Sequence, residues 1–137
     1  MVQYYSDGVT VAAGGFFPLN NAAYSKGCTV SHSAPATLEL NKKGVYQVNV
    51  DSFATLEAAG DYSIQLYRNG VPMAQAINTT TVAAGEIGST HFSTFVVVPN
   101  DNCACNCVSA PVTLQLANAS VVDVTDAHVN VSVTKIC

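Results

Sequence analysis

Hydrophobic and polar side chains alternate at every second position along most of this chain, and this period of two constrains the fold more than any other feature. In residues 44–53, GVYQVNVDSF, the side chains of Tyr46, Val48 and Val50 share one face. Successive side chains of a β-strand point to opposite faces of its sheet, so the alternation predicts strands with one buried face. The chain also has 20 valines and 12 threonines, whose branched side chains favour strands over helices.

Further alternating runs follow along the chain, and turn residues separate them. Residues 61–70, DYSIQLYRNG, end in Asn69-Gly70, a pair that readily adopts the positive φ angles of a tight hairpin turn. Residues 89–98, STHFSTFVVV, become apolar on both faces, as expected for a strand that is covered on both sides. Weaker runs lie near residues 9–11, 28–31 and 37–40. We therefore expect an all-β, antiparallel two-sheet sandwich of eight to ten strands, of the jelly-roll or immunoglobulin type, in a single domain over residues 1–137.

The composition indicates a surface that other subunits cover. Charged residues make up 10% of the chain, whereas an ordinary soluble domain has roughly 25%. A surface of uncharged polar and small apolar groups repels copies of itself weakly, so we expect an oligomer or a member of a larger assembly. The net charge of −4 and the lack of a basic patch exclude nucleic acid as an expected partner.

The N-terminal residues MVQYYSDGVT contain neither a charged region followed by an apolar run nor any long apolar stretch. A secretion signal and a membrane-spanning helix both require such a stretch. We expect a chain that is made and folded in a cytoplasm and has no membrane partner.

Several segments in a fixed order resemble one known family. A Gly-x-Tyr-x-Val strand at Gly44, Tyr46 and Val48 follows the polar turn NKKG, and it is succeeded by YSIQLYRNGVPM, FSTFVVV, VTLQLAN and VNVSVTKI. In this order and spacing, over residues 37–136, the chain resembles the jelly roll shared by tumour necrosis factor and the globular head of the first complement component. Bacterial collagen-like surface proteins and bacteriophage appendages contain versions of the same fold.

This resemblance implies a homotrimer built around one sheet whose outer face is unusually apolar. The FVVV run, which is apolar on both faces of its strand, and the low content of charged residues agree with that expectation. The residues expected at the trimer interface are Tyr46, Phe92, Phe95 and Val97. Aromatic residues near the N-terminus are candidates to anchor a partner, and these are Tyr4, Tyr5, Phe16 and Phe17. For Phe16 and Phe17, which precede Pro18, packing in the core or the trimer is the favoured alternative.

The resemblance also suggests two functions. The chain has no Gly-x-y stalk and no secretion signal, so it most resembles a phage virion component, a trimeric decoration or head-fibre protein added to a capsid. The alternative is a receptor- or glycan-binding head of a phage fibre or bacterial surface protein. The expected location is the virion, assembled in the host cytoplasm, or else a bacterial cell or spore surface.

Catalytic and metal-binding residues are sparse. No nucleophile elbow, phosphate-binding glycine loop or His-Glu-x-x-His motif occurs, so we expect no enzyme and no cofactor. His32 is expected to be an inert loop residue, and His91 an interface or strand-edge residue. Residues 121–129 place Asp123, Asp126 and His128 close together, which suggests either a metal site or, more simply, a polar turn before the last strand.

Three of the five cysteines alternate with other residues in PNDNCACNCVSAP, residues 99–111. The Cys-x-Cys-x-Cys spacing of Cys103, Cys105 and Cys107 differs from the paired Cys-x₂₋₄-Cys arrangement of structural zinc sites. An odd total leaves at least one thiol unpaired within the chain, with Cys28 and Cys137 as the distant partners. Disulfides, free thiols and a shared metal remain alternatives. We predict that the cluster and Cys137 link neighbouring subunits, as a thiol fastener.

Overall fold

The computed structural model describes residues 1–27, 29–99 and 107–136, and these residues form ten strands and no helix. The expected all-β architecture is therefore confirmed, and the described residues contain no helix that could cross a membrane. The strands are β1 (Val2–Val11), β2 (Asn21–Ser25), β3 (Val30–Ala34), β4 (Thr37–Lys42), β5 (Gly44–Leu56), β6 (Gly60–Arg68), β7 (Val71–Val82), β8 (Ile87–Val98), β9 (Cys107–Asn118) and β10 (Val124–Lys135).

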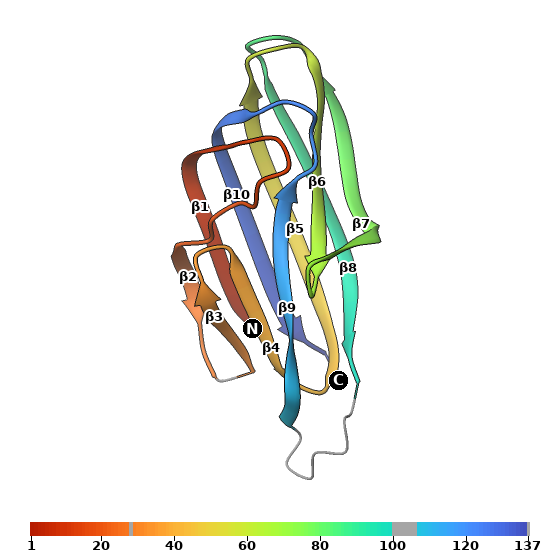
Figure 1. Cartoon of the computed structure of the whole chain (residues 1–137). Helices are drawn as coiled ribbons and strands as arrows, with labels where there is room; N and C mark the ends of the chain where they lie inside the picture. Colours follow the sequence, from red (N-terminus) through yellow and green to blue (C-terminus); the bar gives the residue numbers. More distant parts are fainter. Residues whose placement is uncertain (28, 100–106, 137) are drawn as a thin grey trace.

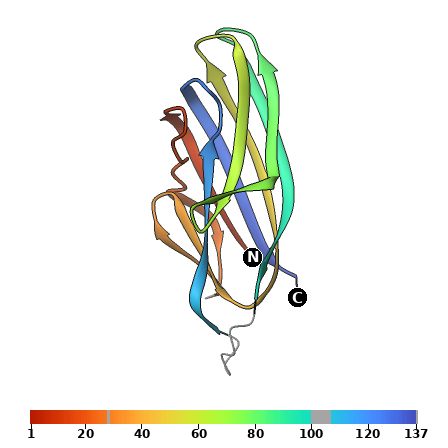
Figure 2. The same cartoon turned by 45° about the vertical axis from the view of Figure 1, so that its right-hand side comes forward.

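The strands form two five-stranded antiparallel sheets that pack as the layers of an elongated sandwich (Figures 1 and 2). Sheet A has the order β2-β1-β10-β5-β8, and sheet B has the order β3-β4-β9-β6-β7. The first and last long strands, β1 and β10, are hydrogen-bonded neighbours in sheet A, as in a jelly roll. The strand order thus resolves the earlier choice between a jelly roll and an immunoglobulin fold.

The core lies between the sheets and is formed by the apolar side chains that alternation places inward. Tyr46, Val48 and Val50 of β5 are all 1% exposed or less, as their shared face predicts. Asn69 and Gly70 have φ angles of 51° and 80° and connect β6 to β7 in the predicted tight turn. Strand β2 was not predicted, because all five of its residues are exposed at the edge of sheet A and carry no alternating pattern.

One buried amide, that of Asn118, joins three segments at one end of the sandwich. Its side-chain nitrogen donates to the carbonyl oxygens of Val11, Ala12 and Val122, at 3.2, 3.3 and 3.2 Å. Its side-chain oxygen accepts from the backbone nitrogen of Ser120 at 3.1 Å. A fully buried polar side chain is stable only when it is hydrogen-bonded, so Asn118 fixes the end of β1 to the β9–β10 loop.

A hydroxyl chain crosses the interior from sheet B to sheet A. Tyr62 donates to the hydroxyl of Ser52 at 3.0 Å, and Ser52 donates to the carbonyl oxygen of Thr90 at 3.1 Å. Burial raises the pKa of Tyr62 to about 12, although its hydrogen bond to Ser52 acts in the opposite direction. Burial likewise raises the pKa of Tyr46.

We expect the raised pKa of Tyr62 to make the fold sensitive to alkali. An unfolded tyrosine loses its proton near pH 10, whereas folded Tyr62 keeps its proton until about pH 12. Unfolding therefore releases a proton between these values, and the free energy of unfolding falls as the pH rises above 10, by about 1 kcal/mol at pH 11 from this group. Urea unfolding at pH 9 and pH 11 measures the loss, which should be smaller in Tyr62→Phe. An equal loss in both proteins would contradict the assignment.

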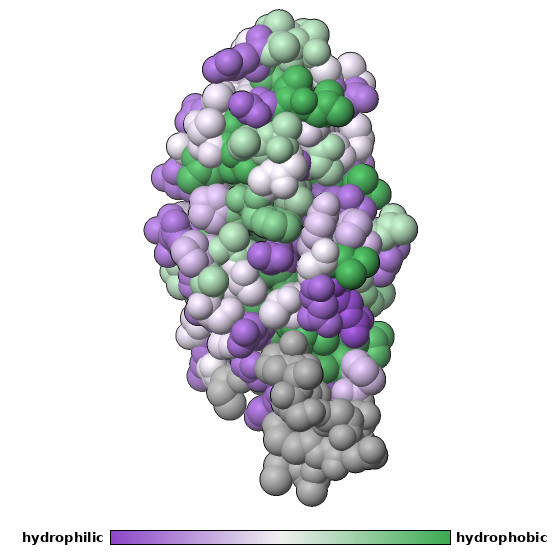
Figure 3. Space-filling model, in the orientation of Figure 1, coloured by the Kyte–Doolittle hydropathy of each residue, from purple (hydrophilic) through white to green (hydrophobic). Residues whose placement is uncertain are grey.

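The two ends of the sandwich differ in chemistry. At the upper end in Figure 1, three turns repeat the sequence Ala-Ala-Gly, at residues 12–14, 58–60 and 83–85, and Figure 3 shows many apolar side chains there. The carboxylates at or next to these turns are those of Glu57, Asp61, Glu86 and Asp123. The cations lie at or beyond the opposite ends of their strands, and these are Lys26, Lys42, Lys43, Arg68 and Lys135. The described part of the molecule is thus polarised along its length.

Candidate assembly interface

The outer face of sheet A is formed by the residues that alternate with the core residues. Along β8, Thr90, Val96 and Val98 are buried, whereas Phe95 is 57% exposed and Val97 is 52% exposed. Two adjacent large apolar side chains on a solvent-facing strand are unusual, because exposed apolar surface in a soluble monomer is normally scattered. This face is therefore the first candidate for contact with another chain.

The apolar end of the face is built from three elements. Val45 of β5 lies directly opposite Val97 of β8, and the backbone nitrogen of Ile136 donates to the carbonyl oxygen of Val45 at 2.8 Å. Ile136 is itself 49% exposed. Phe95 lies in the next row, opposite Gln47. The result is an exposed apolar patch formed by Val45, Phe95, Val97 and Ile136.

The middle of the face is polar but uncharged. Asn49 lies opposite Ser93 on one side and Ser132 on the other, and Ser132 lies opposite Gln3. Gln3 donates to the side-chain oxygen of Asn130 at 2.9 Å. Because no side chain in this row has a charge to desolvate, the row is less costly to bury than a charged one.

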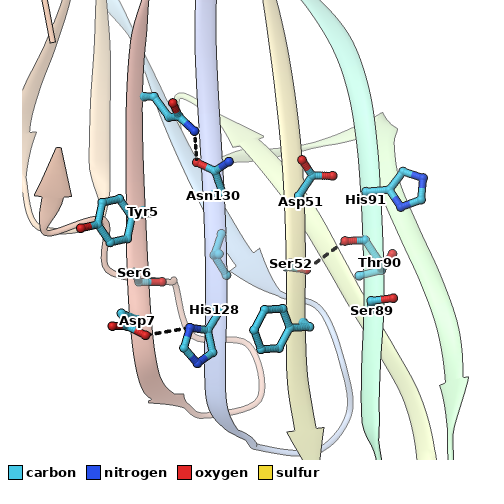
Figure 4. Close-up of a pocket in the computed structure, with 13 residues that line it drawn as sticks. Tyr5, Ser6, Asp7, Asp51, Ser52, Ser89, Thr90, His91, His128 and Asn130 are labelled. Carbon is cyan, nitrogen blue, oxygen red and sulfur yellow. Dashed lines mark hydrogen bonds and ion pairs between the residues drawn. The ribbon is translucent and has the colours of Figure 1, made fainter. Parts of the chain in front are cut away.

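The half of the face nearer the Ala-Ala-Gly turns is hollowed into a groove of about 610 Å³ that crosses β1, β10, β5 and β8 (Figure 4). His128 of β10 stacks on the ring of Phe53 of β5, with ring centres 4.5 Å apart and planes 17° apart. The Nδ1 atom of His128 lies 2.8 Å from a carboxylate oxygen of Asp7 of β1. Asp51 and His91 form the neighbouring cross-strand pair. The groove therefore contains two histidines, two carboxylates and an exposed aromatic ring.

The alternation of side chains places two of the four expected interface residues on the inner face of sheet A, which corrects that expectation. Tyr46 is fully buried in the core, and its hydroxyl donates to the carbonyl oxygen of Lys42 at 2.7 Å. Phe92 is half-buried and packs against the core from the inner face of β8. Neither side chain shares the outer face with Phe95 and Val97, which alone of the four remain candidates for the interface.

The four N-terminal aromatic residues do not form one anchor. Tyr4 is buried in the core, which corrects its expected role as a partner anchor, and Phe17 is buried there as well, in agreement with the alternative of core packing. Tyr5 lines the groove of sheet A, whereas Phe16 contacts Tyr67 of β6 in sheet B, with ring centres 5.2 Å apart. The two that stay exposed therefore lie on different sheets.

The other candidate residues are also placed by the structure. His32 stacks on Tyr4 and is half-buried, rather than being a freely exposed loop residue. His91 lies on β8, the edge strand of sheet A, and its carbonyl oxygen accepts from the side chain of Asn78 on β7. This bond connects the edges of the two sheets.

The possible metal site is not assembled. Asp123 accepts a hydrogen bond from the backbone nitrogen of Ala13 at 2.9 Å, and Asp126 lies 4.0 Å from the Nε2 atom of His128. Among the described residues, no group of three or more potential ligands could hold a metal ion. Cys103, Cys105 and Cys137 lie outside the described residues. Cys107 begins β9, but its side chain also lies outside the described part. The thiol fastener stays a prediction.

Together, the strand order and the two packed sheets define a jelly-roll fold, and its likeness is to the jelly rolls of tumour necrosis factor and complement proteins. No protein-family model matches the sequence, and a search of curated proteins finds no significant match. The likeness is to solved structures, and it covers nearly the whole chain.

Three of these structures show the range of the likeness. The PRD1 vertex protein P5 superposes with a TM-score of 0.67 at 15% identity, over 99% of this chain and 96% of that chain. The globular domain of a zebrafish complement 1qA protein superposes with a TM-score of 0.71 at 6% identity, over 99% and 96%. The Eiger tumour necrosis factor of S. frugiperda gives 0.61 at 14% identity, over 99% and 92%. At such low identities the likeness shows the fold alone.

Proposed function

We propose that this chain is a non-enzymatic structural protein of a bacteriophage virion, a homotrimer that attaches to the capsid as a decoration or head-fibre protein. The observation that carries the proposal is the outer face of sheet A, where Phe95, Val97 and Ile136 are exposed beside an uncharged polar row. The full-length likeness to a vertex protein supports a virion role.

The chemistry of this face suits a contact between copies. An interface core is typically depleted of charge and enriched in aromatic and apolar residues, with polar groups around it. From the row of Gln3 and Ser93 to the row of Val97, the outward side chains of β10, β5 and β8 are uncharged. In the jelly-roll family that this chain resembles, trimers form through such a sheet face.

Two linked measurements test the proposal. We expect light scattering after size exclusion to give three times the chain mass, and the trimer to bind assembled capsids that lack this protein at a fixed stoichiometry. A matched capsid preparation that already contains the protein is the control, because its sites are filled. A monomer at all concentrations would contradict the trimer, and a trimer that ignores capsids would contradict the virion role. Repeating the mass measurement with reductant tests the predicted fastener of Cys103, Cys105, Cys107 and Cys137.

A receptor- or glycan-binding head is the second candidate, and one observation favours it. Phe16 and Tyr67 form an edge-to-face aromatic pair on the outer side of sheet B, with Phe16 36% exposed. Exposed aromatic rings are frequent anchors in recognition surfaces. Such a head binds host cells or glycans as an isolated trimer, whereas a decoration protein requires the capsid.

A further inference from the structure

One acid–base pair, Asp7 and His128, lines the groove of sheet A. The two side chains come from neighbouring strands, and the carboxylate lies 2.8 Å from the imidazole Nδ1 atom. Asp7 is 68% exposed and His128 is 33% exposed, so water reaches both in the single chain. The stack against Phe53 fixes the orientation of the imidazole ring.

The groups that face His128 are acidic or neutral. Its Nε2 atom lies 4.0 Å from a carboxylate oxygen of Asp126 on its own strand. Beyond Phe53 on β5, the neighbouring row carries Asp51 opposite His91 of β8. The titratable groups of β1 at the groove are Tyr5 and Asp7. Among the residues that the structure describes, no lysine or arginine lines the groove, so the two histidines are the groups there that can offset its carboxylates.

We propose that burial of this groove against a second copy of the chain takes up a proton on His128, which makes trimer assembly tighter at mildly acidic pH. The inference rests on the proposed trimer and adds its regulation. While His128 is neutral, a covered groove holds the uncompensated charge of Asp7, and burial of an unpaired charge is costly. Protonated His128 completes an ion pair with Asp7, and this pair is less costly to bury than the lone carboxylate.

The direction of the effect follows from this difference. A proton that binds the trimer more tightly than the single chain favours assembly as the pH falls through the range of about 5–8 in which a histidine titrates. If each of three histidines bound its proton about tenfold more tightly in the trimer, the association constant would rise by about a thousandfold.

Sedimentation equilibrium between pH 5 and pH 8 tests the proposal on the full chain. We expect the association constant of the unmodified protein to rise as the pH falls. We expect His128→Gln to remain a folded trimer whose constant is nearly independent of pH. Asp7→Asn removes the charge that requires the proton, so it should assemble at pH 8 about as well as at pH 6. His32→Gln is the matched control, since His32 stacks on Tyr4 outside the groove, and it should keep the full dependence.

Each other outcome has a definite meaning. A trimer whose association constant does not change with pH overturns the inference and leaves the proposed function intact. The same holds if His128→Gln keeps the dependence and His91→Gln removes it, because the proton would then bind beside Asp51. A chain that stays monomeric at every pH overturns both proposals. Circular dichroism of each variant separates a loss of assembly from a loss of folding.

Discussion

The Phe95→Glu variant is expected to be a folded monomer. Phe95 is 57% exposed in the single chain and lies beside Val97 in the apolar patch of sheet A, so glutamate is tolerated there while the chain is alone. In the proposed trimer the same position is covered, and three carboxylates would lose water without gaining a cation. The cost of burying an unpaired charge is several kcal/mol for each ion, which exceeds what a moderate interface supplies.

Light scattering after size exclusion measures the mass of this variant, and a thermal melt by circular dichroism checks its fold. Ile77→Glu is the matched control, because Ile77 is 44% exposed on β7, the edge strand of sheet B. We expect Ile77→Glu to keep the mass of the unmodified protein. If Phe95→Glu remained a trimer and Ile77→Glu became a monomer, the interface would lie on sheet B instead.

The Asn118→Asp variant is expected to lose at least about 3 kcal/mol of folding stability. The side-chain nitrogen of Asn118 donates to three carbonyl oxygens, and aspartate replaces that donor with an acceptor. A carboxylate would then face three carbonyl oxygens in a site with no access to water. Either the charge is buried without a partner or the group stays protonated at neutral pH, and both alternatives are costly.

Urea unfolding at pH 7 measures this loss, and the chain offers a matched control. Asn20→Asp makes the same chemical change at an exposed position and should alter the free energy of unfolding by no more than about 0.5 kcal/mol. The loss in Asn118→Asp should also decrease at low pH, because a protonated carboxyl is less costly to bury than a carboxylate. An equal stability for the two variants would show that the Asn118 bonds do not hold the end of β1.

Alternation predicted most of the strands, but it could not tell which apolar residues remain outside. Tyr46, Val48 and Val50 were correctly placed on one face, and that face is the core. The expectation that Tyr46 joins an interface was wrong for this reason: a side chain in register with core residues points inward. The same parity separates Phe92, on the inner face of β8, from Phe95 on the outer face.

The groove, and the contact between Asp7 and His128 within it, could not be predicted from the sequence for a different reason. Asp7 and His128 meet only because β1 pairs with β10, and the local pattern of either strand contains no information about its partner. Within this pairing, the register that brings the two side chains together depends on bulges between Ser6 and Val11. Asn118 was missed likewise, because two of its three acceptors, the carbonyl oxygens of Val11 and Ala12, come from a distant segment.

The separation of carboxylates and cations toward opposite ends gives each described chain a lengthwise electric dipole. In any three-fold assembly the components of the three dipoles along the axis add, while those across it cancel. Such a trimer experiences a torque near a charged surface and approaches it with one end leading, over distances of about the 8–10 Å Debye length of physiological salt. For the proposed attachment to a capsid, the trimer is thereby partly aligned before it contacts the capsid surface. Raising the ionic strength removes this alignment.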